Sequence, residues 1–244
     1  DEGAERAQAA EAAGAGTRAG GVADEAAVGA LQAAHPAADP TRLLGVIREL
    51  RELEGGVDFQ AAMRQSLSST AAESGYSEEN FAYGSTPFAT WLKVFAVPAV
   101  QGGLALCREG AKSYMVWGSS SGWLVFYGAL TFGVRSVGCE LLACHVDTST
   151  ELAARHGVER AEFVAGDMLA SDLGEVGVLM LASQCWDRDL QERAAEKIRS
   201  ELPPGSVVVD YSARICELCG REPAETIELP VSWNPAQKMC VFVM

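Results

Sequence analysis

The sequence predicts an α/β fold in which a largely parallel β-sheet carries helices on both faces and ends in an antiparallel hairpin. Two observations predict it. From Ser113 onward, short strand-like runs of apolar residues alternate with helical segments, which is the pattern of a parallel sheet. The last two strand-like runs have no helix between them and are joined by the turn sequence WNPAQK, so they should pair as a hairpin.

The α/β domain is expected to span residues 113–244. Its strands are predicted at residues 113–118, 135–141, 161–166, 176–183, 206–211, 226–232 and 238–244. Its helices are predicted at about residues 121–132, 147–156 and 187–200.

A helical N-terminal region is predicted before the sheet, over residues 39–112. Asp39 is a typical N-cap with Pro40 at the first helical position, and apolar residues then recur at helical spacing as far as Gly55. A second helix is expected at about residues 59–68.

The segment YGSTPFATWLKVF predicts a third helix in this region. Ser85 or Thr86 is expected to cap it, with Pro87 in its first turn. Its apolar face would be formed by Phe88, Trp91, Leu92 and Phe95, which are spaced i, i+3, i+4 and i+7.

Residues 1–38 are predicted to form an extended tail rich in Ala and Gly. The segment has no aromatic residue, so it can bury little apolar area against its own domain. Ordering it would cost roughly 1 to 2 kcal/mol per residue in backbone entropy. We therefore expect protein partners to contact this tail and to order it.

Composition indicates which kinds of partner the protein can have and how it relates to membranes. A formal net charge of −14 argues against nucleic-acid binding, which relies on clustered Lys and Arg, and favours a basic protein partner. No transmembrane segment is expected, because Gly128 and Thr131 interrupt the longest apolar run, residues 123–134. Peripheral association with a membrane complex stays open.

The seven cysteines are odd in number and scattered, which favours free thiols in a reducing intracellular compartment. Cys216 and Cys219 form a lone CxxC, and without a second pair we predict no metal site. The chain begins with Asp1 and not with Met, for which a removed targeting peptide, as in plastid import, and a cropped sequence are the two explanations.

Three elements at strand ends predict a nucleotide cofactor site, because ligands of open parallel sheets bind beyond the carboxyl ends of the strands. The small residues from Gly118 through Ser120 to Gly122 follow the first strand, where a cofactor can approach the backbone. Glu140 ends the second strand, the position of an acid that accepts hydrogen bonds from a ribose diol. Asp167 follows the third strand and is placed to flank an adenine.

From about Tyr83 to its C-terminus the chain resembles the class I S-adenosylmethionine-dependent methyltransferases, most closely the disruptor-of-telomeric-silencing type of histone lysine methyltransferase. The matching pieces are YGS, GSSSG, GCE, GD and LASQCW, at residues 83–85, 118–122, 138–140, 166–167 and 181–186. The resemblance implies a Rossmann-like seven-stranded sheet, S-adenosylmethionine as cofactor, and methyl transfer to a protein side chain. Tyr83 and Gln184 would then orient the acceptor amine.

Several positions depart from the family pattern. Trp117 replaces the acid before the glycine-rich turn, Ser120 replaces its central glycine, and Ser85 replaces a glutamate. We expect Trp117 and Trp123 to add bulk beside the turn, and the Ser120 side chain to stand where the cofactor's carboxypropyl group passes.

These departures leave three functions open. The first is an active methyltransferase. The second is a catalytically silent methyltransferase-like subunit of a larger assembly, an organellar or photosynthetic one being conceivable from the Ala-rich composition. The third is a nicotinamide-dependent oxidoreductase, which the terminal hairpin and the absence of a GxGxxG sequence disfavour.

Overall fold

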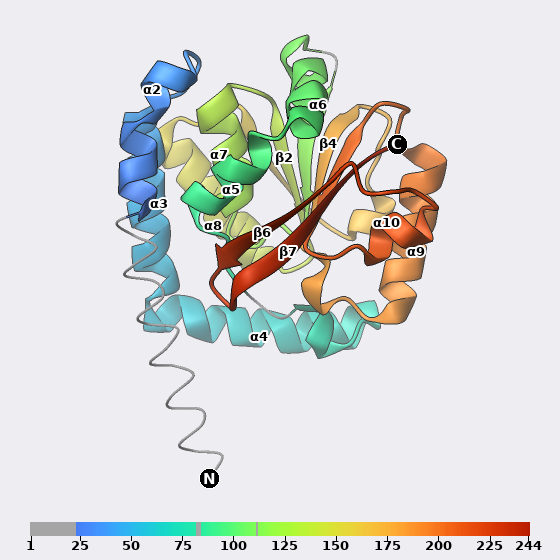
Figure 1. Ribbon diagram of the computed structural model, residues 1–244. Coiled ribbons are helices and arrows are strands. Elements are labelled where there is room, and N and C mark those ends of the chain that lie inside the picture. The colour runs from blue at the N-terminus through green and yellow to red at the C-terminus, as the bar shows by residue number, and fades with distance from the viewer. Residues whose placement is uncertain (1–22, 82–83, 111) are drawn as a thin grey trace.

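The computed structural model describes residues 23–81, 84–110 and 112–244, and a seven-stranded sheet forms its centre (Figure 1). The strand order is β3-β2-β1-β4-β5-β7-β6. The first five strands run parallel, and β7 lies antiparallel between β5 and β6. This confirms the predicted fold class, a Rossmann-like methyltransferase sheet closed by an antiparallel hairpin.

The strands fall close to the predicted ranges and are mostly one or two residues shorter. They are β1 Ser113–Trp117, β2 Ser136–Glu140, β3 Ala161–Ala165, β4 Val176–Leu181, β5 Val207–Asp210, β6 Glu225–Val231 and β7 Asn234–Val243. The hairpin turn is tighter than predicted, because β7 takes in most of the sequence WNPAQK. Only residues 232 and 233 lie between the two strands.

Helices cover both faces of the sheet and one of its ends. They are α2 Leu31–Ala34, α3 Pro40–Glu54, α4 Val57–Ser74, α5 Phe88–Phe95, α6 Pro98–Arg108, α7 Trp123–Phe132, α8 Ala143–His156, α9 Arg188–Glu201 and α10 Arg214–Leu218. Three short 3₁₀ helices are η1 Glu78–Phe81, η2 Met168–Ala170 and η3 Ser183–Cys185. Residues 23–29 are also helical.

Side chains of β1 alternate between two apolar cores, one on each face of the sheet. Tyr114 and Val116 join the core shared with α3 and α5 to α8, whereas Met115 and Trp117 join the core shared with α9 and α10. Every residue of α7 is buried, because α3 packs against α7 as well as the sheet. The long apolar run of the sequence is thus a core helix.

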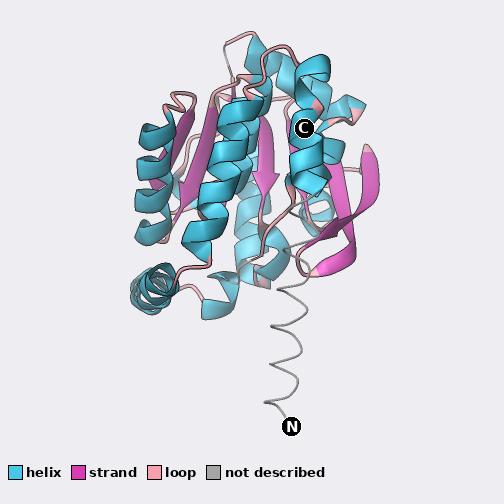
Figure 2. Ribbon diagram, turned by 90° about the vertical axis from the view of Figure 1, so that its left-hand side faces the viewer, coloured by secondary structure: helices cyan, strands magenta, loops and turns pink. Residues whose placement is uncertain are grey.

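The helix α4 lies apart from the two layers that flank the strands. It runs across the lower end of the sheet in Figure 1 and is seen end-on in Figure 2. It contacts α3 and α8 near its start and η1 after its end. None of its residues is fully buried. It is six residues longer than predicted at its C-terminal end, where Gly75 adopts a left-handed conformation with φ of 75°.

Asp39 caps α3 as predicted, through a hydrogen bond from the Arg42 N–H at 2.9 Å. The predicted cap of α5 is wrong. Pro87 occupies that position, because Ser85 and Thr86 have long-range partners. The Ser85 N–H donates to Ser232 Oγ at 2.9 Å, and the Thr86 hydroxyl bonds to that of Tyr211.

The predicted tail differs from the structure over residues 23–38, and its residues 1–22 lie outside the described part. Val28 and Leu31 are 2% and 1% exposed and join the core beside α3. Asp24 accepts from the Arg51 side chain at 2.7 Å and from the Ala89 N–H at 3.0 Å. A few apolar side chains and one partly buried ion pair therefore attach this segment to its own domain.

Among the described helices, no single one combines the length and the apolar composition that crossing a membrane requires. The pair α5 and α6 together meets those two criteria, with a bend of 88° between the helices.

Candidate functional site

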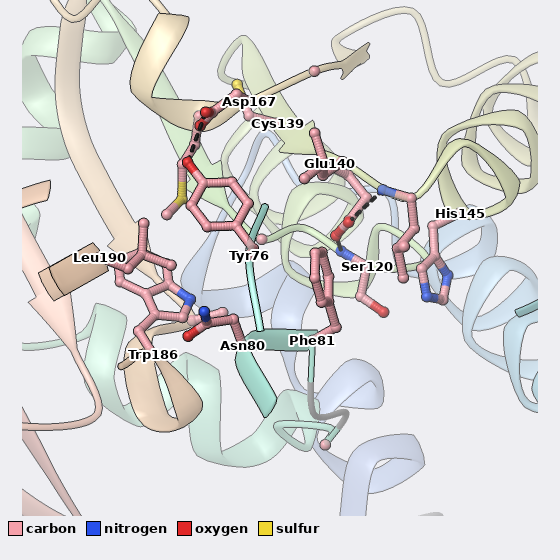
Figure 3. A pocket seen from close by; sticks show the side chains of 17 residues that line it. Tyr76, Asn80, Phe81, Ser120, Cys139, Glu140, His145, Asp167, Trp186 and Leu190 are labelled. Carbon is pink, nitrogen blue, oxygen red and sulfur yellow. Dashed lines mark hydrogen bonds between the residues drawn. The ribbon is translucent and has the colours of Figure 1, made fainter. Parts of the chain in front are cut away.

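A pocket lies between the carboxyl ends of the strands β1 to β4 and the segment that follows α4 (Figure 3). Four of the predicted cofactor residues line it, namely Gly118, Ser120, Glu140 and Asp167. They come from the ends of three neighbouring strands, which explains why residues so far apart in the sequence converge. The cavity measures about 130 Å³.

The glycine-rich turn after β1 is held against β2 by its backbone. The N–H groups of Gly118 and Ser119 both donate to the carbonyl oxygen of Cys139, at 3.0 and 3.2 Å. Gly118 and Ser120 have φ of 71° and 49°, in the left-handed region. Glycine adopts that region at little cost, whereas serine does so with strain.

Glu140 is the best-positioned polar group of the pocket. Its Oε2 accepts the Ser120 N–H at 2.8 Å, and its Oε1 accepts the Leu142 N–H at 2.9 Å. Burial raises the pKa of this carboxyl, and the hydrogen bonds from Leu142 and Ser120 oppose that rise. Each carboxylate oxygen can accept a second hydrogen bond, so Glu140 can still bind a vicinal diol.

Asp167 has a different set of partners. Its Oδ1 accepts the Leu169 N–H at 2.8 Å and so caps η2, while its Oδ2 accepts the Tyr76 hydroxyl at 2.7 Å. Burial, followed by the hydrogen bond and the charge of Asp167, raises the pKa of Tyr76 to about 12. Tyr76 is therefore a neutral donor at physiological pH.

The Ser120 side chain indicates which kind of ligand would suit the pocket. Its Oγ is buried at the pocket and has no hydrogen-bond partner among the described residues. An unpaired buried hydroxyl costs free energy that a polar ligand would recover. Together with the unused acceptor capacity of Glu140, this favours a ligand that carries hydroxyl or amine groups.

The two tryptophans expected to crowd the turn do not line the pocket. Trp117 points into the core beside α9 and donates from its indole nitrogen to Ser171 Oγ at 3.0 Å. Trp123 donates from its indole nitrogen to Glu54 Oε1 at 2.6 Å. The expected obstruction by these two side chains is therefore absent from the described pocket.

The remaining predicted residues lie elsewhere. Gly122 does not line the pocket, and a Cβ there would come within 2.7 Å of the Phe163 ring, so its small size serves packing between α7 and β3. Gln184 is exposed in η3 outside the pocket lining, and its Oε1 accepts from Gln237 Nε2 at 3.4 Å. Tyr83 lies outside the described residues, next to Gly84, which does line the pocket.

Sequence reasoning missed several residues that complete the pocket. The segment after α4 contributes Tyr76, Asn80 and Phe81, and α8 contributes His145. The one local feature of the sequence that could have indicated these pocket residues is the presence of aromatic side chains, Tyr76 and Phe81, in an otherwise polar loop. Trp186 also lines the pocket, from the LASQCW segment that the resemblance had already singled out.

His145 closes the inner wall of the pocket. Its Nδ1 lies 3.0 Å from Ser121 Oγ, and its ring contacts Phe59 of α4 at a centroid distance of 5.6 Å. Burial lowers the pKa of His145 to about 4. The imidazole is therefore neutral near pH 7 and joins the turn to α4.

No protein-family model and no curated protein sequence matches the chain. Solved structures do resemble it. An RNA methyltransferase from Salinibacter ruber, in complex with S-adenosyl-L-homocysteine, is 23% identical with a TM-score of 0.46, over 60% of this chain and 90% of that one. A TehB-like SAM-dependent methyltransferase from Corynebacterium glutamicum is 18% identical with a TM-score of 0.43, over 58% and 86%.

The mitomycin 7-O-methyltransferase MmcR is 17% identical with a TM-score of 0.47, over 76% of this chain and 68% of that one. At such low identities and scores the likeness carries no inference about function. The fold assignment rests on the strand order and on the terminal hairpin.

Proposed function

We propose that this protein binds S-adenosylmethionine in the pocket at the ends of β1 to β4 and transfers its methyl group to a protein side chain. The observation that carries the proposal is the position of Glu140, which ends β2, lines the pocket and is oriented by the Ser120 N–H of the glycine-rich turn. A carboxylate fixed in this way suits the ribose hydroxyls of a nucleoside.

When bound, S-adenosylmethionine supplies a methyl group on a positively charged sulfur. Glu140 would hold the ribose, and Asp167 would accept a hydrogen bond from the adenine amine. Gly118 lets the cofactor lie close to the end of β1, since this residue carries no side chain. The two carboxylates also favour a cationic ligand over an anionic one by their charge.

The acceptor would be an amine on a basic protein, since a net charge of −14 favours encounter with positively charged partners. Gln184, exposed at the carboxyl end of β4, remains the candidate to orient that amine, together with Tyr83. Holding the amine in line with the methyl group would supply most of the rate.

A second candidate function is that of a methyltransferase-like subunit that has lost catalysis and serves a larger protein assembly. Two observations favour it. The cavity of about 130 Å³ is smaller than the roughly 300 to 1,000 Å³ of typical ligand pockets. Ser85, at the position of a glutamate in the family pattern, bonds to Ser232 of the hairpin and does not line the pocket.

The nicotinamide-dependent alternative lacks support from the topology. Dinucleotide-binding sheets have strand order 3-2-1-4-5-6 with parallel strands. Here an antiparallel β7 is inserted between β5 and β6.

Calorimetric titration of the purified protein with S-adenosylmethionine, S-adenosylhomocysteine and NAD would test the proposal. We expect both sulfur-containing ligands to bind and NAD not to bind. Methyl transfer would then be measured as tritium incorporation from labelled S-adenosylmethionine into a mixture of basic proteins. Binding with incorporation identifies the enzyme, and binding without incorporation into any protein supports the silent subunit. The absence of binding, both by the wild type and by a variant in which Tyr76 no longer bonds to Asp167, overturns the cofactor assignment.

A further inference from the structure

We propose that Tyr76 is a latch that occupies the adenine end of the pocket and must leave it before the cofactor binds. This proposal rests on the proposed function, since it concerns access to the same site. The Tyr76 hydroxyl donates to Asp167 Oδ2 at 2.7 Å, across 91 positions of the sequence (Figure 3). The amine of an adenine is also a donor, so the two groups use the same acceptor.

The size of the cavity makes the competition steric as well as polar. The carboxylate oxygen has two lone pairs and could in principle accept from both donors. The Tyr76 ring itself lines the cavity, however, and its volume of about 130 Å³ is below the roughly 300 to 1,000 Å³ of pockets that hold a whole cofactor-sized ligand. Displacing the ring would enlarge the pocket and free Asp167 at the same time.

The segment that carries Tyr76 is built to move as a unit, and we call residues 75–81 the strap. It begins at Gly75, which ends α4 with φ of 75° and where an added Cβ would meet no atom within 4 Å. It contains η1, none of whose residues is fully buried. No residue of the strap is fully buried, although Tyr76 packs against the edge of the core beside α9. Shallow burial and a glycine at the start are features of segments that open locally at low cost.

Polar contacts hold the strap closed. Besides the Tyr76 bond to Asp167, Asn80 makes two reciprocal bonds with Asp187: its Nδ2 donates to Asp187 Oδ2 and its Oδ1 accepts the Asp187 N–H, both at 2.7 Å. The guanidinium of Arg193 lies over the Tyr76 ring at 5.6 Å. All three contacts anchor the strap to elements around the pocket, and only the Tyr76 hydroxyl blocks a ligand-binding group.

If the cofactor binds only when the strap is open, its apparent affinity equals the affinity of the open form multiplied by the fraction of molecules that are open. Removing the Tyr76 hydroxyl should therefore strengthen cofactor binding, whereas removing a direct ligand contact would weaken it. The sign of the change separates a latch from a binding residue.

The test compares S-adenosylhomocysteine affinity by calorimetry in the wild type, Tyr76→Phe, Asp167→Asn and the double variant. Tyr76→Phe keeps the ring beside Arg193, and Asp167→Asn keeps an oxygen for the Leu169 N–H. We expect Tyr76→Phe to bind roughly tenfold tighter than the wild type, the scale of one lost hydrogen bond to a carboxylate. In the Asp167→Asn background the same change should give a smaller gain, because the hydrogen bond from Tyr76 to a charged acceptor is already lost.

Backbone hydrogen exchange of residues 76–81, measured without ligand, provides a second readout. We expect faster exchange in Tyr76→Phe than in the wild type. Asn80→Ala is the matched control, because it should speed exchange of the strap while leaving the Tyr76 bond to Asp167 in place.

The outcomes separate the latch from the proposed function. Wild-type binding with equal or weaker binding by Tyr76→Phe overturns the latch and leaves the cofactor assignment intact. Binding by Tyr76→Phe alone supports both. If neither protein binds, the cofactor assignment fails, and unchanged exchange of the strap in Tyr76→Phe then overturns the latch as well.

Discussion

The Ser120 N–H donates to Glu140 Oε2 at 2.8 Å, which joins the glycine-rich turn after β1 to the end of the neighbouring strand β2. The bond fixes the carboxylate in the pocket before any ligand arrives. Its donor is a backbone group, so it survives substitution of the Ser120 side chain. Glu140 is therefore oriented for a ligand independently of which side chain stands at position 120.

Replacing Glu140 should weaken cofactor binding more than any other single change in the pocket. Glu140→Ala removes a charged acceptor from the ribose, which costs about 1.5 to 3 kcal/mol of binding free energy. Asp167→Ala should cost less, because its loss also releases Tyr76 from the pocket. Calorimetric titration with S-adenosylhomocysteine measures both, with the exposed Glu159→Ala as control. Unchanged affinity in both pocket variants would place the ligand elsewhere.

Ser120→Gly should stabilise the fold. The residue adopts φ of 49°, which strains a side-chain-bearing residue, and its buried Oγ has no hydrogen-bond partner in the described structure. Relief of both should raise the free energy of unfolding by about 1 kcal/mol. Urea denaturation measures this, with Ser200→Gly in the helix α9 as control, where glycine should destabilise by about 0.5 kcal/mol relative to serine. Equal destabilisation by the two changes would contradict the strain at Ser120.

Gly122→Ala should destabilise the fold more than Gly157→Ala does. Both glycines have positive φ, 87° and 62°, so alanine is strained at each by roughly 1 kcal/mol. At Gly122 the added Cβ would also meet Phe163 at 2.7 Å, whereas at Gly157 nothing lies within 4 Å. We expect an additional loss of about 1 to 3 kcal/mol at Gly122, as for overpacked cores. Thermal unfolding of the two variants checks it, and equal losses would argue against close packing of α7 on β3.

Asp210 should make the protein less stable as the pH rises from about 4 to about 7. Burial raises its pKa from 3.8 to about 7, although a hydrogen bond from Ser183 opposes the rise. The folded state therefore binds the proton more tightly than the unfolded state, and stability is lost as the pH increases through that window.

Asp210→Asn removes this titration and keeps an oxygen for the Tyr211 N–H, which donates at 2.7 Å. At pH 8 the variant should be more stable than the wild type by a few kcal/mol, because each tenfold difference in proton affinity between the two states corresponds to about 1.4 kcal/mol. Asp172→Asn is the matched control, since that exposed carboxylate also accepts one backbone N–H. Urea-denaturation midpoints measured from pH 4 to pH 8 test this prediction. If the midpoints of the wild type and of Asp210→Asn change with pH in the same way, the titration of Asp210 does not affect stability and the prediction is wrong.

The sheet, and those site residues that directly follow a strand, could be predicted from the sequence because both depend on the local pattern of apolar and polar residues. Strand and helix periods identify the strand ends, and the residues just after those ends, such as Gly118 and Glu140, then converge in any open parallel sheet. The antiparallel hairpin followed from the missing helix between the last two strands.

The strap could not be predicted, because its place depends on tertiary contacts. The Tyr76 bond to Asp167 and the Asn80 bonds to Asp187 join residues 91 and 107 positions apart. No period or spacing encodes them. The misplaced cap of α5 has the same cause, since Ser85 bonds to Ser232 across 147 positions. Polar residues in loops satisfy their hydrogen bonds wherever the fold brings partners, which local propensity does not register.

A crystal structure of the protein with S-adenosylhomocysteine tests most directly whether Glu140 and Asp167 hold a nucleoside at the ends of β2 and β3. We expect the ribose hydroxyls within hydrogen-bond distance of the Glu140 carboxylate, the adenine at Asp167, and Tyr76 moved away from the pocket. A ligand bound elsewhere, or a pocket that stays closed by Tyr76 at saturating ligand, would contradict this assignment.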